Sequence, residues 1–423
     1  MKVALCFGEG PREPFGGVAA RARAAARELA RRGHRVHCLV AARRSERPPG
    51  TAERYERDGV STIEVALAPP ARAADTWLAP RARVAFEDLL AELRPDVAHF
   101  HHLAGWGAGC LDSARRAGAR VFFTAHDFHL LCPGGRSRRA DGAPCAVLAD
   151  PAARPLAACA DCAGGHAEYA GPASARGPDG PGAAALRRLW MREMLAGADR
   201  VLAPSRCAAD LLAAAGAVAA DRLEVLPGGR ATPAAAGPLR EPRRSAPGRP
   251  LAVGFVGELR PAGGAHVAVD AAARPADAAL ELHVYGALDA DPDYVAELRA
   301  RAAGAPVRFH GPCASEAADR VLGTLDLLVA PDLGCAASAP AVDEAFARRV
   351  PVVASDCCAP AEAVRDGVCG RLVPPGDAPA LAAVLRELSA DRDALYALAA
   401  GTPAVPGPEQ RVDRLEEVYT DAG

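Results

Sequence analysis

The chain has 423 residues, of which 50% are hydrophobic and 24% charged, with a formal net charge of -2 at pH 7. This length exceeds what one hydrophobic core usually organises, so we expect two domains of roughly 200 residues each. The composition excludes wholesale disorder, and the near-neutral charge excludes binding to nucleic acid through the overall charge of the protein.

The amino-terminal segment predicts a buried strand and no secretory signal. Its apolar run, Val3–Phe7, ends at Gly8 and is too short for the hydrophobic region of a signal peptide. No window of the sequence reaches the ~20 apolar residues that a membrane span needs. We therefore expect a cytoplasmic protein without a transmembrane segment, with peripheral membrane contact left open. The 13 cysteines are odd in number and mostly scattered, which argues against a secreted disulfide framework.

In the first half of the chain, apolar runs of strand length alternate with stretches of helical period. The first strand leads through a glycine-rich loop into an Ala/Arg-rich helix over 18–32, which Gly33 would end. The strand over 36–40 completes a βαβ unit. Further strands are expected at 97–100, 121–124 and 200–203. This alternation predicts an α/β domain with a parallel sheet.

Two irregular segments interrupt the alternation. Residues 131–182 are rich in Gly, Pro, Ala and Cys and too long for an ordinary connection, so we expect an insertion or a lid. Residues 231–250 lack periodicity, as an interdomain linker does. We therefore predict one domain over 1–230 and a second over 251–405, followed by a terminal segment over 406–423.

The second half repeats the α/β pattern. Strands are expected at 251–256, 282–285, 307–310, 327–330 and 350–355. They predict another doubly wound sheet. Two such domains would place the carboxyl ends of both sheets around a shared crevice, where ligands of open α/β sheets bind.

The first loop contains glycines but lacks the complete dinucleotide fingerprint. Gly8 and Gly10 are followed by Gly16 and Gly17, and no glycine stands at the third fingerprint position. The loop either brings a substrate anion to the amino end of the following helix or forms a tight turn without a ligand.

Eight segments, taken in order, carry a family resemblance. In the first half they are Gly16-Gly17 with the helix end at Arg32–Val36, then Pro95–His102, Phe123–Asp127 and Ala198–Ser205. In the second half they are Val256–Pro261, Asp326–Pro331, Asp343–Ala347 and Val350–Ser355. At these intervals the chain resembles the family 4 glycosyltransferases over nearly its whole length.

The resemblance implies a GT-B fold and transfer of a sugar, of hexosyl type, from a nucleotide diphosphate to a hydroxyl acceptor. It also implies retention of the anomeric configuration, no cofactor for the transfer, and a role in carbohydrate biosynthesis. The first domain would bind the acceptor and the second the nucleotide sugar, while the helix over 409–419 would return to the first domain. Motif positions assigned to the donor site are Gly16, Gly17, Pro204, Ser205, Glu344 and Ala345.

Three donor-site positions depart from the family pattern. The family neutralises the diphosphate with an Arg and a Lys, and the matching residues here are Glu258 and Gly263. Of the two family glutamates, Glu344 is retained and the other falls on Ala336. Lys2 is the only lysine, but a bias against lysine would favour Arg and not Gly. Either Arg260 substitutes as the cation, or the chain is a degenerate member that serves as a binding partner or scaffold.

Histidines follow two of the predicted strands. By resemblance, His126 and Asp127 are the expected catalytic residues, and His126 would contact the donor sugar or help position the acceptor with Asp127 as its polar partner. The alternative is a satisfied structural pair. His99, His101 and His102 could suggest a metal, but His101 and His102 would point to opposite faces of a strand, which favours structural polar positions.

Four cysteines fall in the predicted insertion, at Cys132, Cys145, Cys159 and Cys162. They would either hold a structural zinc ion or remain unligated loop thiols. Cys357, Cys358 and the remaining cysteines are interpreted as small buried residues. No HExxH or deaminase pattern supports a catalytic zinc.

Overall fold

The structure is a computed structural model of the chain. It describes residues 1–8, 17–42, 47–68, 74–132, 145, 181–231, 249–274, 279–289, 291–313 and 317–421. Most of the predicted insertion and linker lies outside these residues. The chain divides into two compact units, where unit 1 is Met1–Gly10, Ala22–Pro227 and Glu409–Gly423, and unit 2 is Pro11–Arg21 and Gly228–Pro408.

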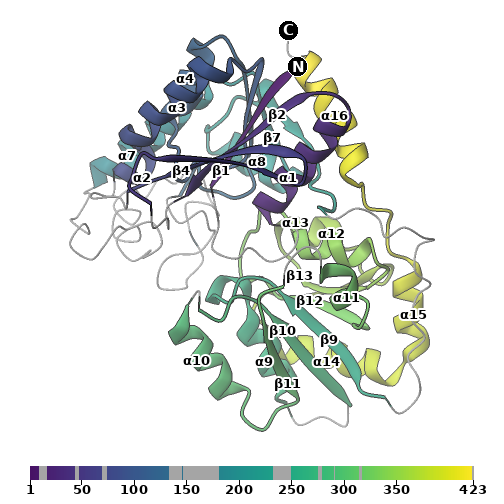
Figure 1. The fold of residues 1–423 in the computed structure, drawn as a ribbon. Coiled ribbons are helices and arrows are strands. Elements are labelled where there is room, and N and C mark those ends of the chain that lie inside the picture. Colours follow the sequence, from purple (N-terminus) through teal and green to yellow (C-terminus); the bar gives the residue numbers. More distant parts are fainter. Residues whose placement is uncertain are drawn as a thin grey trace. The chain divides into compact units, whose positions relative to one another are not determined.

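Unit 1 is built on an eight-stranded sheet in the order β3-β4-β2-β1-β5-β6-β7-β8 (Figure 1). The strands are β1 (Lys2–Gly8), β2 (Arg35–Ala42), β3 (Ala52–Arg57), β4 (Val60–Ala66), β5 (Val97–Phe100), β6 (Arg120–Thr124), β7 (Arg200–Ala203) and β8 (Leu223–Val225). All neighbouring strands pair in parallel except β3 with β4. The predicted βαβ unit at the start of the chain is confirmed.

The antiparallel hairpin β3-β4 was not predicted. Its two strands are joined by Asp58 and Gly59, whose φ angles are 55° and 75°. Asp-Gly with both residues at positive φ is the usual connection of a two-residue hairpin, so the dipeptide was the signal that could have revealed it.

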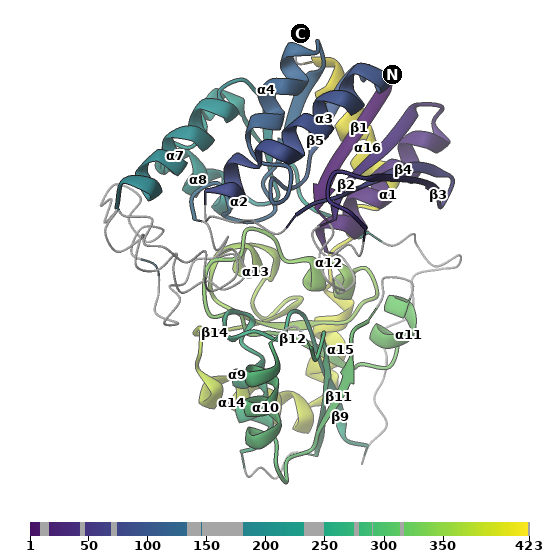
Figure 2. The same ribbon diagram turned by 60° about the vertical axis from the view of Figure 1, so that its left-hand side comes forward.

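The helices of unit 1 lie on both faces of its sheet (Figure 2). They are α1 (Val18–Arg31), whose first residues are counted with unit 2, α2 (Asp75–Leu78), α3 (Pro80–Leu93), α4 (Gly109–Arg116), α7 (Pro181–Leu195), α8 (Arg206–Ala214) and α16 (Pro408–Asp421), with a 3-10 turn at Ala220–Arg222. Phe86 of α3 packs on Phe100 with ring centroids 5.6 Å apart. Tyr419 of α16 packs on Phe122 of β6 at 4.9 Å. The aromatic residues of both helices therefore bury the central strands.

Unit 2 contains a six-stranded parallel sheet in the order β11-β10-β9-β12-β13-β14. Its strands are β9 (Leu251–Val256), β10 (Leu280–Tyr285), β11 (Val307–Gly311), β12 (Leu327–Ala330), β13 (Val352–Ser355) and β14 (Gly370–Val373). Its helices are α9 (Ala265–Ala272), α10 (Pro292–Arg301), α11 (Ala318–Leu322), α12 (Pro340–Phe346), α13 (Cys358–Ala363), α14 (Ala378–Ala390) and α15 (Arg392–Ala400), with a 3-10 turn at Pro261–Gly263. The predicted class, α/β with two doubly wound parallel sheets, is confirmed.

Apolar side chains alternate between the two faces of the unit 2 sheet. One core joins residues such as Val253 and Val284 to helices α9, α10, α14 and α15. The other joins residues such as Leu328 and Val352 to α11 and α12. A sheet buried on both faces accounts for the near-continuous apolar runs of its strands in the sequence. No helix among the described residues is long and apolar enough to cross a membrane.

Each sheet has a point at which the strand order reverses. In unit 1, β1 lies between β2 and β5, and in unit 2, β9 lies between β10 and β12. Ligands of open α/β sheets bind beyond the carboxyl ends of the strands at such points. The loops after β1 and β5, and those after β9 and β12, are therefore where functional side chains are expected.

Candidate active site

Three polar pairs lie along the seam between β5 and β6 in unit 1. His99 contacts Thr124, His101 contacts His126, and His102 contacts Asp127, each pair separated by 25 residues in the chain. The constant separation follows from the parallel pairing of β5 with β6, which keeps the two segments in step. We call this set the histidine ladder.

The innermost pair of the ladder is structural. His99 is fully buried, with its Nδ1 2.6 Å from the Tyr419 hydroxyl of α16 and its Nε2 2.7 Å from Thr124 Oγ1. Burial, together with the nearby His101 and Arg411, lowers the pKa of His99 well below its ordinary value. The ring is therefore neutral and bridges the sheet to the terminal helix.

The middle pair is a contact between two buried imidazoles. His101 Nδ1 lies 3.1 Å from His126 Nε2, and the two rings are stacked with centroids 5.4 Å apart. Burial and the charge of Arg411 lower the pKa of His101 to about 3, so His101 is neutral at physiological pH. One ring donates its N–H and the other accepts it, which fixes the orientation of His126. His126 itself is 6% exposed.

The outermost pair joins a histidine to a carboxylate. His102 Nε2 lies 2.9 Å from Asp127 Oδ2, and the side chains are 17% and 33% exposed. Burial raises the pKa of Asp127, but the nearby His102 and His129 oppose it and bring the pKa down to about 2. This pair follows the ends of β5 and β6, and the low pKa of Asp127 keeps its carboxylate ionised at physiological pH at this edge of the sheet.

The structure corrects the predicted pairing of His126 with Asp127. These neighbours contact different partners, because His126 faces His101 and Asp127 faces His102. His126 and Asp127 lie in a bend after the end of β6, where each side chain meets its own partner after β5. His101 and His102 likewise follow the end of β5, so they do not lie within the strand on which their opposite orientation was predicted. No functional role was predicted for His102. The polar residues that follow the neighbouring strand β6 were the feature of the sequence that could have indicated one.

In unit 2, the loop after β9 holds the positions where the family cations were expected. Arg260 Nε is 3.5 Å from Glu258 Oε2, with side chains 17% and 59% exposed. A Cβ added at Gly263 would lie 2.9 Å from the Glu258 carbonyl oxygen. A lysine at position 263 would therefore require this loop to shift. In the loop as it stands, Arg260 is the cation next to Glu258.

Glu344 of α12 is fully enclosed within unit 2. Its carboxylate accepts a hydrogen bond from the Ala231 amide at 2.7 Å and pairs with Arg348 at 2.6 Å. Ala345 is buried as well, and the Ala336 carbonyl accepts from the Ala359 amide at 3.2 Å. A ribose hydroxyl would have to replace one of these partners of Glu344, so ribose binding stays a prediction.

The loop after β12 adds a carboxyl group that the sequence analysis did not single out. Asp332 follows β12 at the unit 2 reversal point, and burial raises its pKa to about 7. The adjacent Pro331 carbonyl lies against Gly264, where an added Cβ would be 1.9 Å from that oxygen. The loops after β9 and β12 therefore pack closely, and Gly264 with its φ of 71° permits it.

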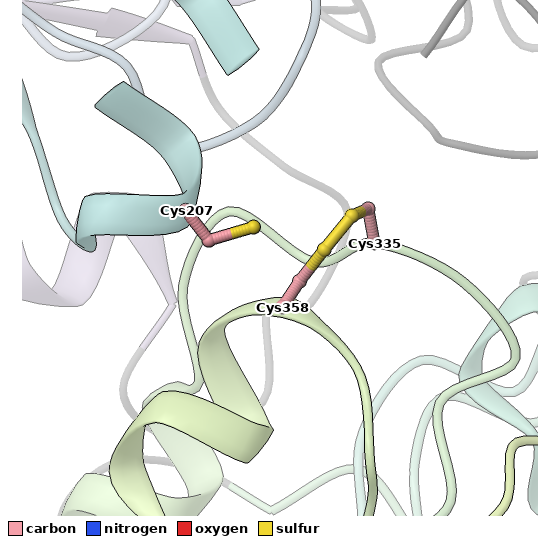
Figure 3. A group of neighbouring side chains, drawn as sticks. All are labelled: Cys207, Cys335 and Cys358. Carbon is pink, nitrogen blue, oxygen red and sulfur yellow. A yellow bond between two sulfur atoms is a disulfide. The ribbon is translucent and has the colours of Figure 1, made fainter. Parts of the chain in front are cut away.

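A disulfide links two segments near this edge. Cys335 and Cys358 are joined by their sulfur atoms, as Figure 3 shows. This corrects the interpretation of Cys358 as an unpaired buried thiol. Cys357 is not part of the disulfide, and its Sγ lies 3.4 Å from the Gly334 carbonyl oxygen. The sequence separation and composition gave no indication of this pairing.

Several other predicted site residues form local hydrogen bonds at helix starts, and others lie outside the residues that the structure describes. Ser205 is buried and caps α8 by accepting from the Ala208 amide at 3.1 Å, and Pro204 precedes it. The Gly17 carbonyl accepts from the Arg21 amide at the start of α1. Gly16, Cys159 and Cys162 lie outside the described residues. The predicted zinc site, of which Cys132 and Cys145 are described, therefore stays a prediction.

Comparisons with known proteins agree with this architecture. A family model described as Glycosyltransferase Family 4 matches residues 15–232, and one described as Glycosyl transferases group 1 matches residues 250–391. No curated protein sequence matches the chain significantly.

Solved structures similar to this chain include the following three. HepE from Anabaena in complex with UDP and glucose is 16% identical, with a TM-score of 0.66 and coverage of 99% of both chains. Sucrose-phosphate synthase from Thermosynechococcus elongatus is 17% identical, with a TM-score of 0.66 and coverage of 99% of this chain and 97% of the other. WaaG, a glycosyltransferase involved in lipopolysaccharide biosynthesis, is 15% identical, with a TM-score of 0.60 and coverage of 97% and 99%. At these identities the likeness establishes the GT-B fold.

Proposed function

Because the chain belongs to glycosyltransferase family 4, we propose that it transfers a hexosyl group from a nucleotide diphosphate to a hydroxyl of an acceptor, with retention of configuration. The observation that carries this proposal is that family models match residues in both units, 15–232 and 250–391. In the reaction, the bond between the anomeric carbon and the diphosphate oxygen breaks. A bond to the acceptor oxygen forms, and the hydroxyl proton passes to the departing diphosphate.

Unit 2 is proposed to bind the donor at the reversal point of its sheet. Arg260 would turn from Glu258 toward the diphosphate and offset the charge that develops on it. Glu344 would exchange the Ala231 amide for a ribose hydroxyl. UDP is the first nucleotide to test, because the similar structure of HepE holds UDP and glucose.

Unit 1 is proposed to bind the acceptor at the outer end of the histidine ladder. Asp127 would accept a hydrogen bond from the acceptor, and His126 would orient the sugar.

The proposed transfer requires no cofactor. A structural zinc ion at Cys132, Cys145, Cys159 and Cys162 would stabilise the insertion and take no part in transfer. We further propose that the protein acts in the cytoplasm.

A second candidate function is a degenerate family member that binds a partner and transfers nothing. The specific observation that favours it is the carboxylate of Glu258 at the position of the family arginine, together with Gly263 at the position of the lysine. Like charges repel, so Glu258 would oppose a diphosphate unless Arg260 outweighs it.

Two measurements separate these candidates. Calorimetric titration with UDP-, GDP- and ADP-sugars is expected to reveal one nucleotide that binds, followed by NMR of the product to read its anomeric configuration. Absence of binding by every nucleotide sugar would rule out the enzyme.

Zinc analysis of untagged protein tests the cysteine site, and less than about a tenth of an equivalent of zinc would argue against it.

A further inference from the structure

The hydrogen bonds of the outermost pair of the histidine ladder determine which of its two side chains can contact a substrate. His102 Nδ1 accepts the Ala104 amide N–H at 2.8 Å. A nitrogen that accepts carries no proton, so the neutral ring bears its hydrogen on Nε2 and donates it to Asp127 Oδ2 at 2.9 Å. Both ring nitrogens are therefore engaged, and His102 has no lone pair directed at a substrate.

Asp127 is held from two sides. Its Oδ2 accepts from His102, and its Oδ1 accepts from the His129 amide at 2.8 Å. His129 is in turn held by Arg187 of α7, which donates to its carbonyl oxygen. Among the residues that the structure describes, the charged and titratable groups that face the carboxylate are thus His102 and His129, with Arg187 behind them. Each carboxylate oxygen retains a further lone pair, and a third of the side chain is exposed.

A carboxylate in this setting binds hydroxyls and does not remove their protons. The low pKa of Asp127, about 2, keeps it ionised over the whole physiological range, while it makes the group too weak a base to deprotonate an alcohol. Each of its two oxygens accepts one hydrogen bond, from His102 and from the His129 amide, and these bonds orient the carboxylate.

We infer that His102 is a positioning residue that orients Asp127 to accept hydrogen bonds from adjacent hydroxyls, so that the unit 1 edge recognises a carbohydrate or other polyol. This inference rests on the proposed function, because it names the chemical class of the acceptor. His102 acts through Asp127 and touches no reacting atom.

The test compares two variants with the wild type. His102→Phe keeps a ring but removes the donor to Asp127, whereas His102→Gln keeps a side-chain N–H that reaches the carboxylate. His37→Phe is the control, since it removes a histidine-serine hydrogen bond elsewhere in unit 1. Circular dichroism and thermal melting establish which variants are folded.

The first readout needs no activity. Aspartate carboxyls labelled with 13C are titrated by NMR, with Asp127→Asn used to assign the Asp127 signal. In His102→Phe the pKa of Asp127 should rise from its wild-type value of about 2, because burial still raises it and the effect of His102 is gone, while His129 continues to lower it. His102→Gln should restore most of the lowering, and the control should leave it unchanged. An unchanged Asp127 titration in His102→Phe would overturn the positioning role.

The second readout is release of UDP from UDP-glucose in the presence of mono- and disaccharide acceptors. His102→Phe should lower kcat/KM for the acceptor roughly 10- to 100-fold and move the acid limb of the pH profile upward, with partial rescue in His102→Gln. Equal acceptor kinetics in all variants would overturn the assignment of the acceptor class. If the wild type binds no nucleotide sugar and releases no UDP, the proposed function fails, while the carboxyl titration still decides the role of His102.

Discussion

The carboxyl edges of the two sheets occupy equivalent places in their units but differ in how their polar groups are satisfied. In unit 1, the histidine ladder pairs each polar side chain with one on the neighbouring strand, and the charge that reaches the edge is the fixed anion of Asp127. In unit 2, Glu258 stands beside Arg260, and desolvation raises the pKa of the half-buried Asp332 to about 7. The unit 1 edge is therefore already organised to bind a neutral ligand. At the unit 2 edge, an anionic ligand would meet the negative charge of Glu258 beside Arg260, while the raised pKa of Asp332 keeps that carboxyl partly protonated near neutral pH.

The largest expected effect comes from the packing of the unit 2 edge. Gly264→Ala should lower the free energy of unfolding by about 4 kcal/mol or more, because the new methyl group meets the Pro331 carbonyl and the backbone has a φ of 71°. Gly304→Ala is the matched control, since its φ is 78° and nothing lies within 4 Å, so that it should cost only about 1 kcal/mol. Urea unfolding of both variants measures the difference. Equal losses would show that the two loops are not closely packed.

The next effect is a pH-dependent gain of stability on removing the Asp332 charge. The folded pKa of about 7 lies above the unfolded value of about 3.9, so the wild type loses stability as pH rises between these values. Asp332→Asn should therefore be more stable than the wild type by about 4 kcal/mol at pH 8, with little difference at pH 4. Chemical denaturation at several pH values measures this. Parallel pH profiles of the two proteins would contradict the raised pKa.

The disulfide should contribute a somewhat smaller stability. Cys335 and Cys358 are separated by 23 positions, and closing a loop of this length stabilises the folded state by about 3 kcal/mol in the chain-entropy model. Cys358→Ser should lose this amount relative to the oxidised wild type, and reductant should abolish the difference. Cys357→Ser, which removes the neighbouring thiol, should remain close to wild type. Thermal melting with and without reductant measures this contribution. A wild-type melting temperature that does not change with reductant would contradict the disulfide.

The smallest effect concerns the charge of Glu258. Glu258→Gln should tighten UDP binding roughly fivefold, because it removes a negative charge beside Arg260. The gain in affinity is modest because Glu258 is exposed and solvent screens its charge. Glu297→Gln on α10 is the control, since it removes an exposed carboxylate remote in sequence from this loop. Calorimetric titration with UDP measures both variants. Weaker binding by Glu258→Gln would mean that Glu258 supports the nucleotide.

The sequence predicted the architecture because its apolar runs mark buried parallel strands directly. Those of unit 2, such as Leu327–Ala330, are apolar throughout and hence easy to recognise. The hairpin β3-β4 was missed because β3 is mostly charged and exposed and the apolar residues of β4 are interrupted by polar ones. The Asp58-Gly59 turn was the clearest signal.

The site was harder to predict because its contacts depend on register between strands. His126 and Asp127 were recognised from their motif, but their partners, His101 and His102, lie 25 positions away and are set by the pairing of β5 with β6. The enclosure of Glu344 by Ala231 and Arg348 likewise arises from tertiary packing. Motifs indicated which residues gather at the sheet edges, and only the folded chain revealed which of them pair.

The most direct test of the account is to follow UDP-glucose by 31P NMR in the presence of the wild-type protein and a set of saccharide acceptors. The account predicts release of UDP that depends on the acceptor and is strongly reduced in Asp127→Asn. Binding of UDP without any release, with every donor and acceptor tried, would contradict sugar transfer and favour the non-catalytic partner.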